Sequence, residues 1–180
     1  MKTKKRLAAV AIVAMAAYST TTYAIETSRP NNQLQIEFVE HEQYTDIETD
    51  HGSPESSAAI VEKSISSAFQ KAANKYLPRG YTLKVSIDDI DLAGDRSMMS
   101  STFGDIRVYR EIYPPHISFT YRVYSPSEQL LAKGEANKTD LAYLYQLNGA
   151  SLPPEEEAPY ITELVRDWAS NELRRAVTKP

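Results

Sequence analysis

Apolar and polar residues alternate along several segments of the chain, as they do in strands that bury one face. The clearest segment is residues 81–87, in which every second residue from Tyr81 to Ile87 is apolar and the residues between them are polar. Four further strands are predicted, over residues 34–39, 106–112, 117–124 and 129–136. The last two strands are separated by a short polar stretch that is typical of a hairpin loop.

A long amphipathic helix is predicted between the first two strands. Ser53 can cap its first turn, Pro54 suits the first helical position, and Glu55 complements the positive end of the helix. Apolar residues then recur at helical spacing, at Val61, Ile65, Ala68, Phe69, Ala72 and Tyr76. After the last strand come a short helix over residues 141–147, a proline- and glutamate-rich linker over residues 152–159, and a final helix from Tyr160.

The resulting element order, β-α-β-β-β-β-α-α, predicts the fold class. Strands joined by short loops favour antiparallel pairing, and helices at both ends of a run of strands favour a helical layer on one face of the sheet. We therefore expect an α+β domain with a mainly antiparallel sheet of about five strands and helices covering one face. The side chains expected to be buried together are Ile65, Phe69, Leu83, Val85, Phe119, Leu164 and Trp168.

The N-terminus has the pattern of a secretory signal peptide. A basic cluster precedes an apolar run over residues 7–17, and the small residues Thr22 and Ala24 suit cleavage after Ala24. The apolar run is shorter than the about 20 residues that a membrane-spanning helix needs; the alternative is an uncleaved N-terminal anchor. The predicted organisation is a signal peptide over residues 1–24, a flexible leader over residues 25–33 and a single domain over residues 34–180.

Charge and cysteine content narrow the expected location and partners. The signal-peptide pattern predicts that the protein is exported through the inner membrane of a Gram-negative bacterium. After cleavage it would be a soluble periplasmic protein that does not insert into the membrane. Loss of the signal peptide leaves 16 basic and 24 acidic residues, a formal net charge of −8. This balance opposes nonspecific binding of nucleic acid or of anionic lipid. The chain has no cysteine, which excludes a lipid-modified cysteine, a disulfide and a thiolate metal site.

An acidic segment follows the clearest strand. Its aspartates are Asp88, Asp89, Asp91 and Asp95. Oxygen-rich clusters bind hard cations, but the spacing differs from an EF-hand loop because Ala93 stands where a ligand is needed. The favoured interpretation is a strand end and turn, in which the carboxylates accept local backbone hydrogen bonds and Gly94 adopts a positive φ. The alternative is a cation site.

No catalytic residue, cofactor or metal site is predicted elsewhere. The three histidines, His41, His51 and His116, lack metal-ligand spacing and belong to no nucleophile motif. Tyrosine is abundant, with 12 residues; strands favour this residue, whereas an exposed tyrosine patch would suit protein or glycan binding. The candidate binding residues are Asp89, Asp91, Asp95, Asp105, Asp140 and Tyr121.

Several short segments share a pattern with one known family. They are residues 36–38, 44–47, 77–80, 89–94, 105–108 and 139–143, together with Tyr121, Gly134 and Trp168. In this order the segments resemble the bacterial family catalogued as domain of unknown function 3016, whose members are exported proteins of similar length. The resemblance covers nearly the whole mature chain. It implies an approximate fold and no activity, cofactor or catalytic residue.

Two hypotheses for the function remain. The first is a noncatalytic binding or accessory module of the cell envelope, whose unidentified partner would be an envelope protein or a glycan. The second is a cation-assisted hydrolase that uses the Asp88–Asp95 segment with Asp105 or Asp140. A paired-carboxylate mechanism needs two acids held a few ångströms apart. Because the sequence contains no catalytic motif, it favours the noncatalytic module over the enzyme.

Overall fold

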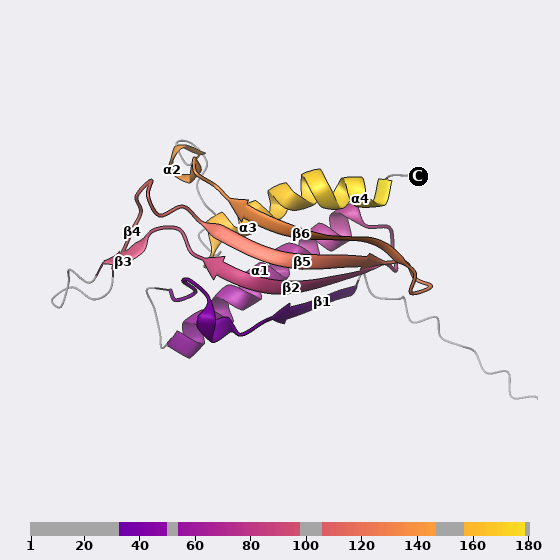
Figure 1. Ribbon diagram of the computed structural model, residues 1–180, viewed down its shortest axis with the longest axis horizontal. Coiled ribbons are helices and arrows are strands. Elements are labelled where there is room, and N and C mark those ends of the chain that lie inside the picture. The colour runs from indigo at the N-terminus through magenta and orange to yellow at the C-terminus, as the bar shows by residue number, and fades with distance from the viewer. Residues whose placement is uncertain (1–32, 50–53, 98–105, 147–156, 179–180) are drawn as a thin grey trace, which may run out of the picture.

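The computed structural model describes residues 33–49, 54–97, 106–146 and 157–178 (Figure 1). The predicted signal peptide, all of the predicted leader except Gln33, and most of the linker over residues 152–159 lie outside the described residues, as do His51, Ser53 and Asp105. The described elements form a four-stranded sheet, a separate two-stranded sheet and several helices. The α+β class is therefore confirmed.

The main sheet has the strand order β1-β2-β5-β6. Its strands are β1 (Gln33–Phe38), β2 (Thr82–Asp91), β5 (His116–Tyr124) and β6 (Leu130–Thr139). Strands β2, β5 and β6 are antiparallel, as predicted, whereas β1 pairs with β2 in parallel. The parallel pair follows from the connection, because the long helix α1 (Pro54–Tyr76) lies between the two strands in the chain and allows the second strand to start at the same end of the sheet.

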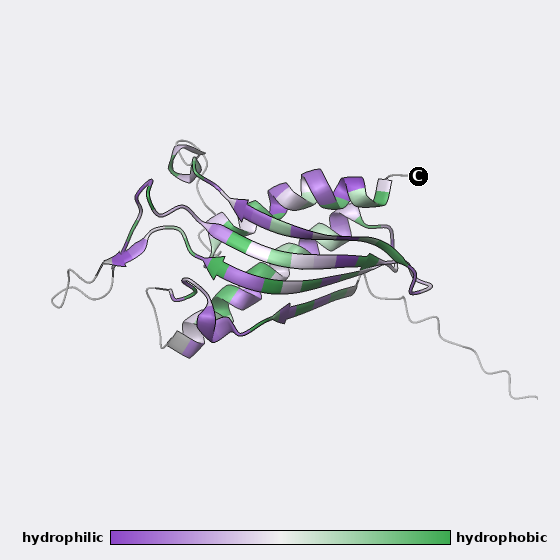
Figure 2. Ribbon diagram, viewed as in Figure 1, coloured by the Kyte–Doolittle hydropathy of each residue, from purple (hydrophilic) through white to green (hydrophobic). Residues whose placement is uncertain are grey.

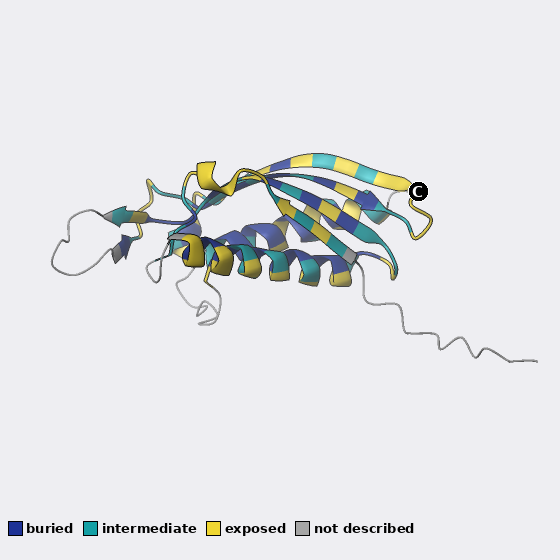
Figure 3. Ribbon diagram, turned by 90° about the horizontal axis from the view of Figure 1, so that it is seen from below, coloured by how far each residue is buried: buried dark blue, intermediate teal, exposed yellow. Residues whose placement is uncertain are grey.

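The long helices lie on one face of the sheet and leave most of the other face open (Figures 1 and 3). Beside α1 lies α3 (Pro159–Trp168), which continues through a π-helical turn, η2 (Ala169–Leu173), into α4 (Arg174–Thr178). No helix within the described parts of the chain has the length and apolar character needed to cross a bilayer. The placement of α1, α3, η2 and α4 on one face of the sheet agrees with the predicted arrangement.

The core lies between the sheet and the helices, and all seven side chains predicted to be buried together are buried. Aromatic rings form its centre: the rings of Phe69 and Phe119 each meet the Trp168 ring edge to face, with ring centroids 5.7 and 5.0 Å from that of Trp168. Such pairs add about 0.5–1.5 kcal/mol beyond the burial of area. The core therefore joins α1, β5 and the C-terminal helix through one aromatic cluster.

The acidic segment departs from the prediction, because β2 continues through it to Asp91. The register against β5 shifts between Ile87 and Asp89, which marks a β-bulge. Ile87 and Ile90 are both fully buried although they are three residues apart. Strict alternation from the first half of the strand would have placed Asp89 in the core. The extra residue in the bulge shifts the alternation by one position, so that Ile90 faces the core instead.

The strand predicted over residues 106–112 is shorter and lies outside the main sheet. Strand β4 (Ile106–Val108) pairs with β3 (Asp95–Ser97), in the separate two-stranded sheet. The chain then turns, with the Tyr113 N–H donating to the Arg110 carbonyl at 3.0 Å. The main sheet therefore has four strands instead of about five. Two short helices complete the fold, η1 (His41–Gln43) and α2 (Tyr143–Gln146).

Candidate functional site

The carboxylate of Asp89 joins β2 to the segment that follows η1. It accepts a hydrogen bond from the Thr45 N–H at 2.8 Å and another from the Thr45 hydroxyl at 2.9 Å. On β5, the Nδ1 atom of His116 lies 3.6 Å from the same carboxylate, and Nε2 lies 3.1 Å from the Asn137 side-chain oxygen. A carboxylate that accepts a backbone N–H from a neighbouring segment matches the structural interpretation of this residue.

Asp91 lies beside Asp46, to which it is joined by an isolated parallel bridge at the end of β2. Burial raises the pKa of the Asp91 carboxyl, and the charges of Asp46 and Asp89 raise it further, against the opposing effect of His116 and Arg107. We call Asp46, Asp89 and Asp91 the acidic end. Among the described residues, no three histidine or carboxylate side chains are placed so that they could hold a metal ion together.

The other predicted acidic residues serve other parts of the fold. Asp140 accepts the Ala142 N–H at 2.8 Å and thereby closes the turn before α2. Asp95 is exposed on β3, and Asp88 is exposed in the bulge of β2. Asp105 lies outside the described residues. Of the candidate acids, the structure therefore brings together only Asp89 and Asp91 among those it describes.

Tyr121 faces the core. Its ring lies 5.0 Å from the Trp168 ring, centroid to centroid, and is buried. Directly opposite on β6, Gly134 leaves room for this ring, since a Cβ atom there would lie 2.9 Å from it. Burial raises the pKa of the Tyr121 hydroxyl, and the charge of Glu172 adds to the effect. Tyr121 therefore contributes to packing between the sheet and the C-terminal helices.

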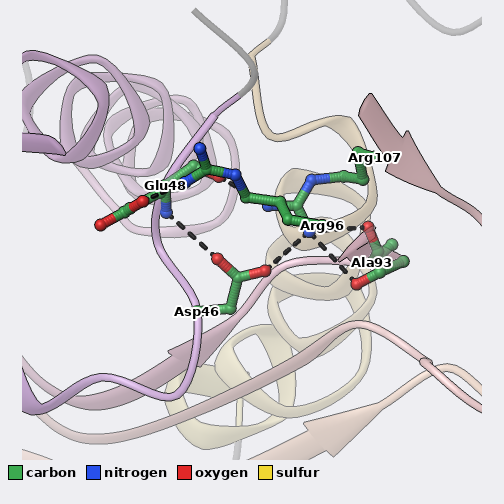
Figure 4. A network of polar contacts seen from close by, with 6 residues as sticks. Asp46, Glu48, Ala93, Arg96 and Arg107 are labelled. Atoms are coloured by element: carbon green, nitrogen blue, oxygen red, sulfur yellow. Dashed lines mark hydrogen bonds and ion pairs between the residues drawn. The ribbon is translucent and has the colours of Figure 1, made fainter. Parts of the chain in front are cut away.

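A buried arginine, which the sequence analysis did not single out, organises the region beyond the acidic end (Figure 4). The Arg107 guanidinium donates to the Asp46 carboxylate at 2.7 Å and to the Glu48 carbonyl at 2.6 Å. It also donates to the carbonyl oxygens of Ala93 and Gly94, at 3.3 and 3.2 Å. Its side chain is 5% exposed. Arg107 thus ties β4 to the segment after η1 and to the turn that leads into β3.

Three tyrosine rings meet at the start of α3. The Tyr160 ring packs edge to face against the Tyr143 ring, with centroids 4.9 Å apart, and lies 5.7 Å from the Tyr109 ring. The Tyr143 hydroxyl donates to the Arg110 carbonyl at 2.8 Å. Burial, with the neighbouring Tyr109 and Tyr143 as further causes, raises the pKa of Tyr160 to about 12. Burial also raises the pKa of the Tyr143 hydroxyl, so Tyr143 and Tyr160 are neutral hydrogen-bonding groups at physiological pH.

A pocket of about 220 Å³ opens beside these rings. Its wall includes Tyr109 and Tyr160, the buried Arg107, and the exposed Glu157. This volume is smaller than the about 300–1,000 Å³ of sites that enclose drug-sized ligands. The pocket therefore suits one inserted side chain or one sugar ring of a larger partner.

Exposed apolar side chains surround the same tyrosines. Ile112 is 71% exposed, Leu141 74% and Tyr145 62%. These side chains belong to two segments, residues 110–115 and 140–145. The segments lie side by side, because the Tyr145 hydroxyl donates to the Glu111 carboxylate and the Asp140 N–H donates to the Pro115 carbonyl. We call this surface the tyrosine end. Its members are Tyr109, Ile112, Leu141, Tyr145 and Tyr160, and the buried Tyr143 ring packs against Tyr160.

Comparison with known proteins identifies a family and no activity. Among solved structures, the chain is similar to a PelC dodecamer from Paraburkholderia phytofirmans, in a single-substitution variant, at 8% identity and a TM-score of 0.34, covering 76% of this chain and 82% of that one. A second PelC dodecamer from the same organism gives 9% identity, a TM-score of 0.25 and coverage of 76% and 84%. Likeness at this level carries no argument about function.

No curated protein matches the chain. The model of one family, described as protein of unknown function DUF3016, matches residues 32–171. The match includes the whole of every strand of both sheets and most of the helical layer. The chain therefore belongs to the DUF3016 family.

Proposed function

We propose that this protein is an exported, noncatalytic binding module of the cell envelope, which contacts a partner protein through its tyrosine end. The observation that carries the proposal is the presence of three highly exposed apolar side chains, Ile112, Leu141 and Tyr145, on two segments that hydrogen bonds hold side by side. Exposed apolar residues scattered singly need no explanation, but a gathered patch on a polar surface is typical of interaction sites. The signal-peptide pattern supports the location in the envelope.

The chemistry of the tyrosine end suits protein recognition. Tyrosine is enriched among the residues that dominate binding energy, because its ring buries a large area while its hydroxyl satisfies a polar group of the partner. The half-buried Tyr160 ring is already held by packing against the buried Tyr143 ring, whose hydroxyl donates to the Arg110 carbonyl. Little side-chain entropy is then lost on binding, so this surface is prepared for a partner.

The carboxylates support the noncatalytic part of the proposal. Asp89 accepts two hydrogen bonds from Thr45, and Asp140 accepts one from the Ala142 N–H. Each of these groups is engaged in joining or closing segments of backbone. A hydrolase that uses paired carboxylates instead needs two acids facing a common substrate site.

Site-specific photocrosslinking in the exporting cell tests the proposal. A photoreactive phenylalanine analogue placed at Ile112 or Leu141 is expected to trap one discrete partner, identified by mass spectrometry. The same analogue at Ile60, which is 41% exposed on the outer side of α1, serves as the matched control. Crosslinking that is equal at all three positions, or absent at Ile112 and Leu141, would contradict the proposal.

Changing both Ile112 and Leu141 to Ser provides an independent readout. These side chains are largely exposed, so the variant is expected to fold with a melting temperature close to that of the wild type. Copurification of the trapped partner should then be lost while export continues. Retained copurification would show that the partner binds elsewhere.

A further inference from the structure

The open face of the main sheet carries a row of like charges. Alternation along the strands points every second side chain away from the helices, as the bands of contrasting hydropathy along β2 and β5 show (Figure 2). The register then places Lys84 of β2 opposite Arg122 of β5, and Arg122 opposite Lys133 of β6. Gln35 of β1 continues the same row beside Lys84. Three basic side chains thus lie next to one another across three neighbouring strands.

This arrangement costs stability. Neighbouring strands lie about 4.8 Å apart, and like charges directly opposite each other on one sheet face are destabilising. Lys84, Arg122 and Lys133 are all exposed, and within the described residues none of the three side chains has an ion pair or hydrogen bond to offset the repulsion. The Lys84 ammonium lies 5.1 Å from the centre of the Tyr124 ring, which is a weak attraction at an exposed site.

Acidic residues accompany the row without neutralising it. Glu37 of β1 and Glu135 of β6 belong to the next row of the face, where they flank Ser86 and Thr120. Diagonal neighbours on a sheet lie about 7–8 Å apart, and within the described residues neither glutamate forms an ion pair with a side chain of the row. The mature chain carries an excess of acidic residues, so three adjacent unpaired cations are a local exception to the overall charge.

The surroundings of the row are suited to sugar hydroxyl groups. A shallow depression of about 240 Å³ lies over β1, β2 and β5. Its polar lining residues are Gln35, Glu37, Lys84, Ser86, Thr120 and Arg122, so Glu37 is the one acidic group among them. Gln35, Ser86 and Thr120 supply amide and hydroxyl groups that both donate and accept hydrogen bonds. Tyr124, next to Arg122 on the same face, adds an aromatic ring against which a sugar ring can stack.

We propose that the open sheet face binds an acidic polysaccharide, laid across the strands with successive carboxylates on Lys84, Arg122 and Lys133. The row spans two strand spacings, about 10 Å, so an extended polyanion can engage all three side chains without drawing the two lysines together. A chain that bears one carboxylate on each sugar unit offers separate anions at a comparable repeat. A lipid surface is disfavoured, because the net charge of −8 after signal cleavage and the neighbouring Glu37 and Glu135 oppose approach to a broad anionic plane.

This site is separate from the tyrosine end, which makes the two proposals independent. The basic row lies on the open face, in the half of the sheet where β1 begins, whereas the tyrosine end surrounds the start of α3. The variant with Ser at Ile112 and Leu141 should therefore bind the polysaccharide as the wild type does. Failure of the protein-partner experiment would leave the polysaccharide proposal standing, and the reverse also holds.

Calorimetric titration of the full exported chain with trigalacturonate at low salt tests the proposal. The test variant carries Lys84→Gln, Arg122→Gln and Lys133→Gln. The matched control carries Lys63→Gln, Lys71→Gln and Arg79→Gln, three exposed residues on or directly after α1. We expect the test variant to lose about tenfold in affinity, because three exposed ion pairs of ordinary strength multiply to that ratio. The control should keep the wild-type affinity.

Other ligands distinguish the remaining explanations. Fully methyl-esterified trigalacturonate should not bind, and added salt should weaken binding of the charged form, since exposed charge pairs are screened. Equal affinity of the test and control variants would overturn the proposal. Inorganic phosphate that binds as tightly as trigalacturonate, or binding to phosphatidylglycerol vesicles alone, would also overturn it. The test variant should melt no lower than the wild type without ligand, because removal of the row relieves repulsion.

Discussion

The buried ion pair of Arg107 with Asp46 gives the sharpest test of how this fold is held together. Arg107→Met keeps an unbranched side chain of similar reach and removes the charge and all the hydrogen-bond donors. It leaves the Asp46 carboxylate and three backbone carbonyl groups, those of Glu48, Ala93 and Gly94, without the guanidinium. Methionine can fill the vacated space, so the main loss is electrostatic.

The expected cost follows from the burial of the two partners. Removal of one member of a buried ion pair costs about 3–5 kcal/mol, because the remaining charge stays in a poorly solvated place. The Asp46 side chain is 22% exposed, whereas that of Arg107 is 5% exposed. Water can therefore partly solvate the Asp46 carboxylate in the variant. We expect a loss at the lower end of the range, about 3 kcal/mol, which is a large share of the about 5–15 kcal/mol that stabilises an ordinary domain.

Urea unfolding followed by circular dichroism measures this loss as a shift of the midpoint at unchanged slope. Arg166→Met is the matched control, because its ion pair with Glu163 is exposed at both ends and such pairs contribute at most about 1 kcal/mol. A double-mutant cycle with Asp46→Asn should show that the two losses are not additive. If Arg107→Met costs no more than Arg166→Met, the reasoning from burial and charge is refuted.

Four further outcomes are expected. Intact mass of the exported protein should show cleavage after Ala24. Trp168→Ala should cost about 3–5 kcal/mol in urea unfolding, because its ring joins the aromatic core. Asp89→Asn should lower the free energy of unfolding by about 1.5–3 kcal/mol through its bonds with Thr45, and by the same amount with calcium, magnesium or chelator. Asp91→Asn should raise the melting temperature at pH 7 and lose this gain below about pH 4.

The sign for Asp91 follows from its surroundings. Burial first, and then the charges of Asp46 and Asp89, raise the pKa of this carboxyl in the folded state. The folded protein therefore holds the proton more tightly than the unfolded chain does, and stability falls as the pH rises through the pKa of the folded state. Asparagine at this position carries no charge, so the variant does not lose stability in this way as the pH rises. Melting curves across the acidic range check the prediction, and a lower melting temperature of Asp91→Asn at pH 7 would contradict it.

Local periodicity explains why the core could be predicted. The spacing of Ile65 and Phe69 along α1, and of Leu164 and Trp168 along α3, follows from helical geometry alone. The alternation in β5 likewise placed Phe119 inward. These patterns depend on no partner strand, so they can be read without knowledge of the tertiary structure.

The bulge in β2 shows where periodicity stops being sufficient. Its position depends on pairing with β5, because Ile87 faces Phe119 while Asp89, two residues later, faces the adjacent Ser118. Nothing in the local sequence distinguishes an extra residue in a strand from the start of a turn. The acidic residues favoured the turn, whereas the burial of Ile90 stabilises the longer strand.

The two proposed surfaces and the Arg107 network depend even more on pairing between residues that are distant in the sequence. Apolar and polar residues alternate around Arg107 as they do in an ordinary strand. Its hydrogen-bond partners come from the distant residues 46–48 and 93–94. The basic residues Lys84, Arg122 and Lys133 belong to three different strands, and only the register shows that they form a row. The abundance of tyrosine was visible in the sequence, but the tertiary fold separates the buried Tyr121 from the tyrosines that meet at α3.

The hydrogen bonds of Arg107 support the tyrosine end and not the basic row. Arg107 lines the pocket of the tyrosine end, together with Ala93 and Tyr109, and holds the turn and the strand that carry them. The basic row is instead supported by the ladder between β2, β5 and β6. Arg107→Met should therefore weaken the contact with a protein partner in mild urea, before global unfolding, while affinity for trigalacturonate remains unchanged. Parallel loss of both activities would show that the domain responds as one cooperative unit.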